Sequence, residues 1–220
     1  SEYEYAFIGF LEAEGWKYSS GNNIHRVTKR DVLIADDFKK FIADTNPDLT
    51  EDEVIQIYDN VRLVGAESDF ATLHKVYGWM VNGVQFTTQD GLPRMIPLID
   101  FDNWDKNIFR VVNQFTVEYT NNGQKENRRP DVLLFVNGMP LCVIELKNPA
   151  DANATIYDAW EQINIRYWRD IPHLLHYCPL ACISDGVKTR LGTVRTPYEH
   201  FYAWRRVNEG DAVSTLPFAE

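Results

Sequence analysis

Residues 129–148 read RPDVLLFVNGMPLCVIELKN, and this stretch decides the fold. Two runs rich in apolar residues, Asp131–Val136 and Leu141–Lys147, flank the pair Asn137-Gly138. An Asn-Gly pair between two such runs is the strongest short-range signal for a β-hairpin. The stretch therefore predicts two adjacent antiparallel strands near the middle of the chain.

Three charged side chains interrupt this apolar hairpin. Glu145 and Lys147 lie two residues apart, so both leave the same face of their strand. With a three-residue turn over 137–139, Asp131 lies directly opposite Glu145 and on its face, whereas a two-residue turn alone places the two carboxylates on opposite faces. The sequence leaves both turns open, and we expect the arrangement in which Asp131, Glu145 and Lys147 converge.

Convergent carboxylates of this kind suit a hard divalent cation. Mg²⁺ prefers oxygen ligands in octahedral geometry and usually keeps several waters. It polarises a phosphate and lowers the pKa of a bound water, while an adjacent lysine orients or deprotonates the attacking water. The alternative is a salt bridge at the surface, which the same spacing also produces by accident.

The flanking sequence predicts one mixed α/β domain over residues 1–220. Amphipathic spacing and capping signals predict helices at Tyr3–Glu14, Asp31–Ala43, Thr50 to about Leu63, Asp69–Trp79 and Asn153–Asp170. Alternating patterns predict strands at Val84–Thr88, Met95–Phe101, Phe109–Tyr119, Leu180–Ser184 and Leu191–Val194. Strands with helices on both sides in the sequence indicate a helical region over about 1–80 and a core over about 83–207.

The order of these segments resembles the PD-(D/E)xK nucleases, and more specifically the N-terminal nuclease region of the restriction (R, HsdR) subunit of type I restriction–modification enzymes. Apart from the helix that carries Glu4, the matching segments are 98–101 (LIDF), 112–115 (VNQF), 129–141, 144–148 (IELKN), 183–186 (ISDG) and 201–204 (FYAW). The resemblance implies a restriction-endonuclease-like mixed sheet flanked by helices, with a helical N-terminal region. It also implies Mg²⁺-dependent cleavage of double-stranded DNA, for which Mn²⁺ substitutes, with Asp131 and Glu145 as metal ligands and Lys147 at the attacking water.

Two further residues follow from the resemblance. The family often carries a Gln-x-x-x-Tyr pattern on the helix after the lysine, and Gln162 is carried over as a catalytic residue. Here Tyr167 follows Gln162 by five positions rather than four, so a regular α-helix would align Arg166 with Gln162 and turn Tyr167 away. Related nucleases often supply an acidic ligand from their first helix, which makes Glu4 a third candidate metal ligand. The alternative for Glu4 is a near-terminal side chain that faces solvent.

Charge restricts where DNA is bound. The chain carries a net charge of −10, with 11 Lys+Arg and 20 Asp+Glu in residues 1–124 but 11 and 12 in residues 125–220. Phosphate contacts supply most non-specific affinity for DNA, so we expect contacts in the second half, with Arg128, Arg129 and Arg166 as candidates. A solvated mixed-charge surface explains these arginines almost as well. Three scattered cysteines and an N-terminus without signal-peptide character favour a reducing cytoplasm, and no apolar run is long enough for a membrane span.

The cluster His173, His176, Cys178 and Cys182 lacks a standard zinc-ligand spacing, so we expect packing there. No Walker-type ATP loop occurs in the chain. The resemblance implies that ATP is used by a DNA translocase motor elsewhere in a longer polypeptide, which acts with methyltransferase and specificity subunits. We therefore expect a nuclease domain that cuts duplex DNA without reading its sequence. The rival interpretation is a non-catalytic docking module of the same fold that holds DNA or a partner subunit.

Overall fold

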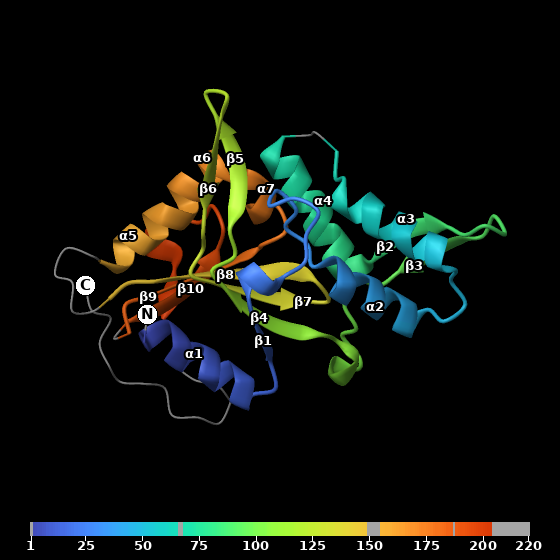
Figure 1. Ribbon diagram of the computed structural model, residues 1–220, viewed down its shortest axis with the longest axis horizontal. Coiled ribbons are helices and arrows are strands. Elements are labelled where there is room, and N and C mark those ends of the chain that lie inside the picture. Colours follow the sequence, from blue (N-terminus) through green and yellow to red (C-terminus); the bar gives the residue numbers. More distant parts are fainter. Residues whose placement is uncertain (1, 66–67, 149–154, 187, 204–220) are drawn as a thin grey trace.

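A seven-stranded mixed sheet forms the centre of the molecule in the computed structural model, which describes residues 2–65, 68–148, 155–186 and 188–203 (Figure 1). The strands lie in the order β1 (Lys17–Ser20), β4 (Phe109–Asn113), β7 (Val132–Val136), β8 (Met139–Leu146), β9 (Leu180–Ser184), β10 (Thr189–Thr193) and β11 (Tyr202–Ala203). The pairs β1–β4 and β8–β9 are parallel and the other neighbours are antiparallel. The predicted hairpin is thus the middle of the sheet, and the mixed α/β class is confirmed.

Helices cover both faces of this sheet. The N-terminal helix α1 (Glu2–Ala13) packs Ile8 against strand residues such as Val132 and Ile144, which forms a small core on one face. The larger core lies on the other face, beneath α2 (Ala35–Thr45), α3 (Glu51–Arg62), α4 (Asp69–Asn82), α5 (Ile156–Glu161) and α7 (Pro172–Leu175). Alternate residues of a strand face opposite sides of the sheet. At the end of the sheet where β7 begins and β8 ends, the odd-numbered residues of both strands therefore face the larger core. None of the described helices is long and apolar enough to cross a membrane.

Local signals located several elements correctly. The capping box predicted at Thr50 is present, since its side chain accepts from the Glu53 N–H while the Glu53 carboxylate accepts from Thr50, and α3 begins directly after it. The second helix, however, begins at Ala35 rather than Asp31. The preceding segment is extended because Val32 and Ile34 are buried and the Ile34 N–H donates to the carbonyl of Gly138.

The strand expected over Phe109–Tyr119 is two strands in different sheets. Gln114 has a φ of 56°, which breaks the extended backbone between β4 and β5 (Val117–Asn121). The β5 strand pairs with β6 (Gln124–Arg128), and this hairpin projects away from the main sheet (Figure 1). A second small hairpin pairs β2 (Val84–Thr87) with β3 (Pro93–Ile96), so the strand predicted over Met95–Phe101 begins and ends earlier than expected.

The helix expected over Asn153–Asp170 is described from position 155 onward; residues 153 and 154 lie outside the described part of the chain, as does Trp204. It consists of α5, a π-helical turn η3 (Gln162–Tyr167) and a last turn α6 (Trp168–Asp170). Short 3₁₀ turns complete the elements, at η1 (Gly21–Asn23), η2 (Trp104–Lys106) and η4 (Tyr198–His200). The division into a helical region and a core stays a prediction, although β1 of the main sheet lies within the first 80 residues.

Candidate active site

The β7–β8 hairpin turns in two residues. Asn137 and Gly138 have φ values of 50° and 76°, and Val136 pairs with Met139 across them. Positive φ at both central positions matches the right-handed twist of the flanking strands, which is why Asn-Gly is favoured there. The three-residue turn that would align the carboxylates is therefore absent.

A β-bulge restores the alignment that this turn alone would lose. The register of β7 and β8 shifts between Leu134 and Phe135, which leaves Leu141 as an extra residue on β8. Beyond the bulge Asp131 lies opposite Glu145, and the Asp131 N–H donates to Glu145 Oε1 at 3.4 Å. The expectation that a two-residue turn separates the two carboxylates is wrong because a bulge inserts one residue and returns the side chains to one face.

Glu145 is the most deeply buried carboxylate of this cluster, with 0% of its surface exposed. Its Oε1 accepts a hydrogen bond from the Tyr167 hydroxyl at 2.6 Å, and its Oε2 accepts one from Gln162 Nε2 at 2.6 Å. Burial, and then the negative charge of Asp131, raise the pKa of Glu145 well above its usual value. The site thus holds a carboxylate that gains from a nearby positive charge.

Asp131 opens β7 at the same end of the sheet. Its Oδ2 accepts a hydrogen bond from the Leu146 N–H at 2.8 Å, which fixes the carboxylate against the neighbouring strand. Burial raises the pKa of Asp131, and the charge of Glu4 adds a smaller rise. Asp131 in turn disfavours the ionised form of Glu145, as expected for acidic groups that share one site.

Lys147 reaches this cluster through Gln162. The Lys147 ammonium donates to Gln162 Oε1 at 2.7 Å, and the Gln162 amide donates from its other end to Glu145. The Lys147 N–H donates to the Ser184 carbonyl at 2.8 Å, so the backbone that carries the ammonium is tied to β9. Gln162 is thus a bridge that sets the distance between the lysine and the buried carboxylate.

The π-helical turn brings Tyr167 to the same point. A π-turn holds one residue more than an α-turn, so side chains five positions apart face one side. Gln162 Nε2 donates to the Tyr167 hydroxyl at 2.8 Å, and that hydroxyl donates to Glu145. The expectation that Tyr167 turns away from Gln162 is wrong, because the helix accommodates the extra residue at η3. The Gln-x₄-Tyr spacing itself is the sequence signal for this turn.

Glu4 lies at the same sheet end, approached from α1. It is 5% exposed, which rules out the alternative of a solvent-facing side chain. Its Oε1 accepts hydrogen bonds from Asn113 Nδ2 at 2.7 Å and from Gln114 Nε2 at 3.3 Å. These two amides at the end of β4 received no role from the sequence, although both are polar residues directly after a buried strand. They hold Glu4 near enough to Asp131 to affect its pKa.

The three candidate DNA-binding arginines separate into two kinds. Arg128 donates from Nε to Asp170 at 2.7 Å and lies over the ring of Tyr119, so it anchors the β5–β6 hairpin, although Asp170 is shared with Arg169 and Arg128 also lines the pocket described next. Arg129 and Arg166 line a pocket of about 230 Å³ together with Gln162 and Tyr167. This basic pocket directly adjoins the carboxylate cluster.

The donor set fits a divalent cation held by a few protein oxygens. In the described part of the chain, no three His, Cys, Asp or Glu side chains gather as a ready-made metal cluster. Asp131 and Glu145 face each other, and both have raised pKa values that a cation would offset. Mg²⁺ is commonly held by one or two carboxylates plus waters and substrate phosphates, so two carboxylates meet its needs.

Comparison with known proteins gives one consistent result. The family described as type I restriction enzyme R protein N terminus matches residues 1–200. A putative type I restriction enzyme MjaIXP endonuclease subunit of Methanocaldococcus jannaschii is 34% identical over 97% of this chain and 21% of its own length. The type I restriction enzyme HindI endonuclease subunit of Haemophilus influenzae is 32% identical over 94% of this chain and 20% of its own length. The chain therefore spans about a fifth of these relatives, and it belongs to the family of type I restriction enzyme R protein N-terminal regions.

Proposed function

We propose that this chain is the endonuclease part of a type I restriction enzyme R subunit, and that it hydrolyses phosphodiester bonds of double-stranded DNA with Mg²⁺. The observation that carries the proposal is the convergence of Asp131, Glu145, Lys147 and Gln162 at one end of the sheet, through a bulge and a π-turn. Both irregularities interrupt regular hydrogen bonding. A module that only docked a partner would have no need for either.

The roles follow from the contacts. Asp131 and Glu145 would hold the cation, with Glu4 as a further acidic group near Asp131. A bound divalent cation supplies Lewis-acid polarisation of the scissile phosphate. Lys147 positions the attacking water and lies where it can stabilise the charge that grows on the phosphate oxygens. Gln162 and Tyr167 fix Lys147 and Glu145 relative to each other.

The basic pocket orients the substrate in this proposal. Arg129 and Arg166 are placed to contact a DNA phosphate beside the cluster. Arg128 lines the same pocket and stays a candidate DNA contact, although Asp170 holds its guanidinium group. The relatives are named endonuclease subunits, and we extend that activity, the ATP-driven translocase in the rest of the polypeptide, and the methyltransferase and specificity subunits to this protein as part of the proposal.

The test uses the complete enzyme assembled with its partner subunits. Asp131→Ala or Glu145→Ala is expected to abolish DNA cleavage while ATP hydrolysis stays near the wild-type rate, because the change removes a ligand far from any motor. Glu12→Ala, which removes an exposed carboxylate from α1, is the matched control and should affect neither activity.

A direct measurement separates metal binding from folding. Titration calorimetry with Mn²⁺ should show heat for the wild type and for Glu12→Ala, but not for Glu145→Ala, while circular dichroism shows that all three are folded. Equal loss of cleavage and ATP hydrolysis in Glu145→Ala would instead support the docking module.

A further inference from the structure

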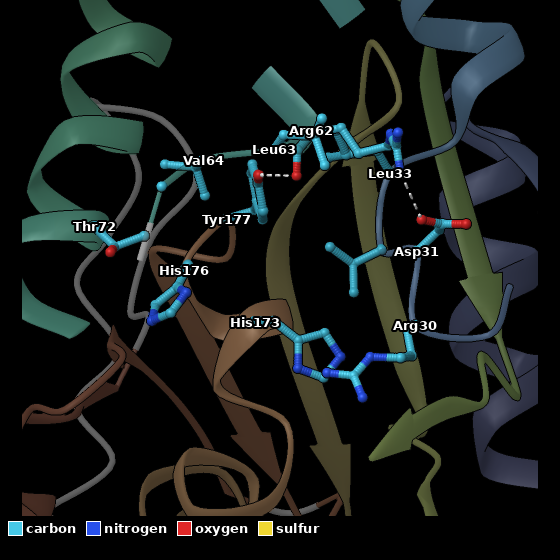
Figure 2. Close-up of a pocket in the computed structure, with 12 residues that line it drawn as sticks. Arg30, Asp31, Leu33, Arg62, Leu63, Val64, Thr72, His173, His176 and Tyr177 are labelled. Carbon is cyan, nitrogen blue, oxygen red and sulfur yellow. Dashed lines mark hydrogen bonds and ion pairs between the residues drawn. The ribbon is translucent and has the colours of Figure 1, made fainter. Parts of the chain in front are cut away.

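A second cavity lies away from the carboxylate cluster, between the end of α3, the start of α4 and α7. It has a volume of about 470 Å³, within the range of small-molecule sites. Its walls include Arg30, Leu33, Leu63, His173 and Tyr177, and none of the residues of the candidate active site (Figure 2). The cavity is therefore a separate site from the candidate active site.

His173 lines this cavity and carries an unsatisfied polar atom. Its Nε2 is buried and has no hydrogen-bond partner among the described residues. Buried polar groups in folded proteins nearly always have a partner, so an orphan nitrogen in a side chain that lines a cavity points to a missing one. Burial, and then the charges of Arg30 and His176, lower the pKa of His173 to about 4, so the imidazole is neutral at pH 7.

Arg30 supplies a cation that the protein does not neutralise. Its guanidinium group makes no ion pair with any residue that the structure describes, whereas Arg62 on the same wall is bonded to Asp59 and Asp31. Figure 2 shows the Arg30 side chain beside the His173 ring and Arg62 turned toward Asp31. The carboxylate of Asp31 also accepts from Thr28. Arg30 is thus a guanidinium group near His173 without a carboxylate partner among the described residues, whereas Arg62 is shared by two carboxylates.

The cavity also has an apolar side. Val32 and Leu33 are buried beneath it, and Leu63 and Val64 line it from the loop after α3. Leu63 is 65% exposed, which leaves apolar surface open to a ligand. A bare inorganic anion would leave this part of the cavity unfilled, and a DNA duplex is too large to enter a cavity of this volume.

We propose that this cavity binds a small organic anion, whose carboxylate or phosphate group contacts Arg30 and His173 and whose apolar body lies against Leu63 and Val64. The oxyanion would pair with the guanidinium group and accept a hydrogen bond from His173 Nε2 in the tautomer that carries a proton there. A ligand in this cavity would contact both the helical region and α7. The α7 helix follows the helical segment that carries Gln162 and Tyr167.

The test measures binding to the 220-residue chain by calorimetry and by thermal shift. Adenosine 5′-monophosphate and benzoate are the two probes, one with a phosphate and one with a carboxylate; adenosine and inorganic phosphate lack the anion and the apolar body, respectively. At least one probe should bind saturably and raise the melting temperature. Adenosine 5′-monophosphate should bind at least tenfold more tightly than adenosine or inorganic phosphate, and benzoate at least tenfold more tightly than inorganic phosphate. The probe that binds identifies the class of the anion.

Two variants assign that binding to the cavity. Arg30→Gln, at an exposed position, should weaken binding at least tenfold, whereas Arg166→Gln in the basic pocket beside the active site should leave it unchanged. The ¹⁵N resonances of the His173 imidazole should also shift on binding. The proposal is overturned if neither probe binds saturably at concentrations up to about 10 mM, which corresponds to a binding free energy of only about −3 kcal/mol. It is also overturned if inorganic phosphate binds as tightly as the probes, or if Arg166→Gln rather than Arg30→Gln removes the binding.

Discussion

Replacing Tyr167 by phenylalanine removes two hydrogen bonds from the candidate site and leaves the ring that fills the core. The lost bonds are the one that the hydroxyl donates to Glu145 at 2.6 Å and the one that it accepts from Gln162 at 2.8 Å. Burial and the charge of Glu145 raise the pKa of Tyr167, so the hydroxyl keeps its proton and acts as a donor. A hydrogen bond to a charged group contributes about 1.5–3 kcal/mol and a neutral one about 0.5–1.5 kcal/mol. Tyr167→Phe should therefore lower the free energy of unfolding by about 2–4 kcal/mol.

Urea unfolding of the metal-free chain at pH 8, followed by tryptophan fluorescence, measures this loss. With an m-value of about 2 kcal/mol/M, the midpoint should fall by about 1–2 M. Tyr202→Phe is the control, because Tyr202 is 66% exposed and no hydrogen bond of its hydroxyl is found among the described residues. A change below about 0.5 kcal/mol in Tyr167→Phe, as expected for the control, would show that the π-turn does not bring Tyr167 to Glu145.

Two further predictions concern pH and the isolated chain. The pKa of Glu145 is raised above its value of 4.5 in an unfolded chain, so the native state holds this proton more tightly than the unfolded state. The free energy of unfolding should therefore fall as pH rises from about 4.5 through the folded-state pKa. Glu145→Gln should lack this decline, and parallel pH profiles of the two proteins in urea unfolding would contradict the raised pKa. The isolated chain, with a net charge of −10, should bind DNA weakly and nick plasmid slowly or not at all with Mg²⁺ or Mn²⁺. Fast, salt-resistant nicking that is lost in Lys147→Ala would show that the chain positions DNA without help from other domains.

Elements with strong local signals were predictable from the sequence. The Asn137-Gly138 pair located the central hairpin, and the Thr50 capping box located the start of α3. Both signals act over a few residues, so they are visible without knowledge of the fold. The extended segment before α2 was not predictable in the same way, because Ile34 is held by the carbonyl of Gly138, about a hundred residues later in the chain.

Polar strands were missed for a different reason. The β6 strand reads QKENR and has no alternation of apolar residues, because the hairpin enters the core through Val117 and Tyr119 of β5 and not through β6. Its place is set by backbone pairing with β5 and by the contact of Arg128 with Asp170, and the hydrophobic pattern reports neither. The small strand β1 is likewise placed by its parallel pairing with β4 and by the hydrogen bonds that Tyr18 and Ser19 make with side chains of β4.

The candidate site was predictable in its residues but not in the backbone that assembles them. Asp131, Glu145 and Lys147 were identified by type and spacing, and Gln162 by resemblance. The bulge beside Leu141 and the π-turn at η3 were each needed to bring them together, and neither follows from hydrophobic periodicity. A bulge and a π-turn have the same effect on a sequence pattern, since each adds one residue to a regular repeat.

The two irregularities act on the same atoms from opposite sides. The bulge sets which face of β8 carries Glu145, and the π-turn sets which face of the helix carries Tyr167; the two side chains then meet at a single hydrogen bond. Returning the strand to regular pairing would move Glu145 to the α1 face of the sheet, away from Gln162 and Tyr167. Regular α-helical hydrogen bonding in place of the π-turn would turn Tyr167 away from Gln162. Glu145 would then stay buried with one hydrogen-bond donor fewer. Neither irregularity places the site without the other, and together they explain how residues whose spacing departs from a regular hairpin and a regular helix still converge.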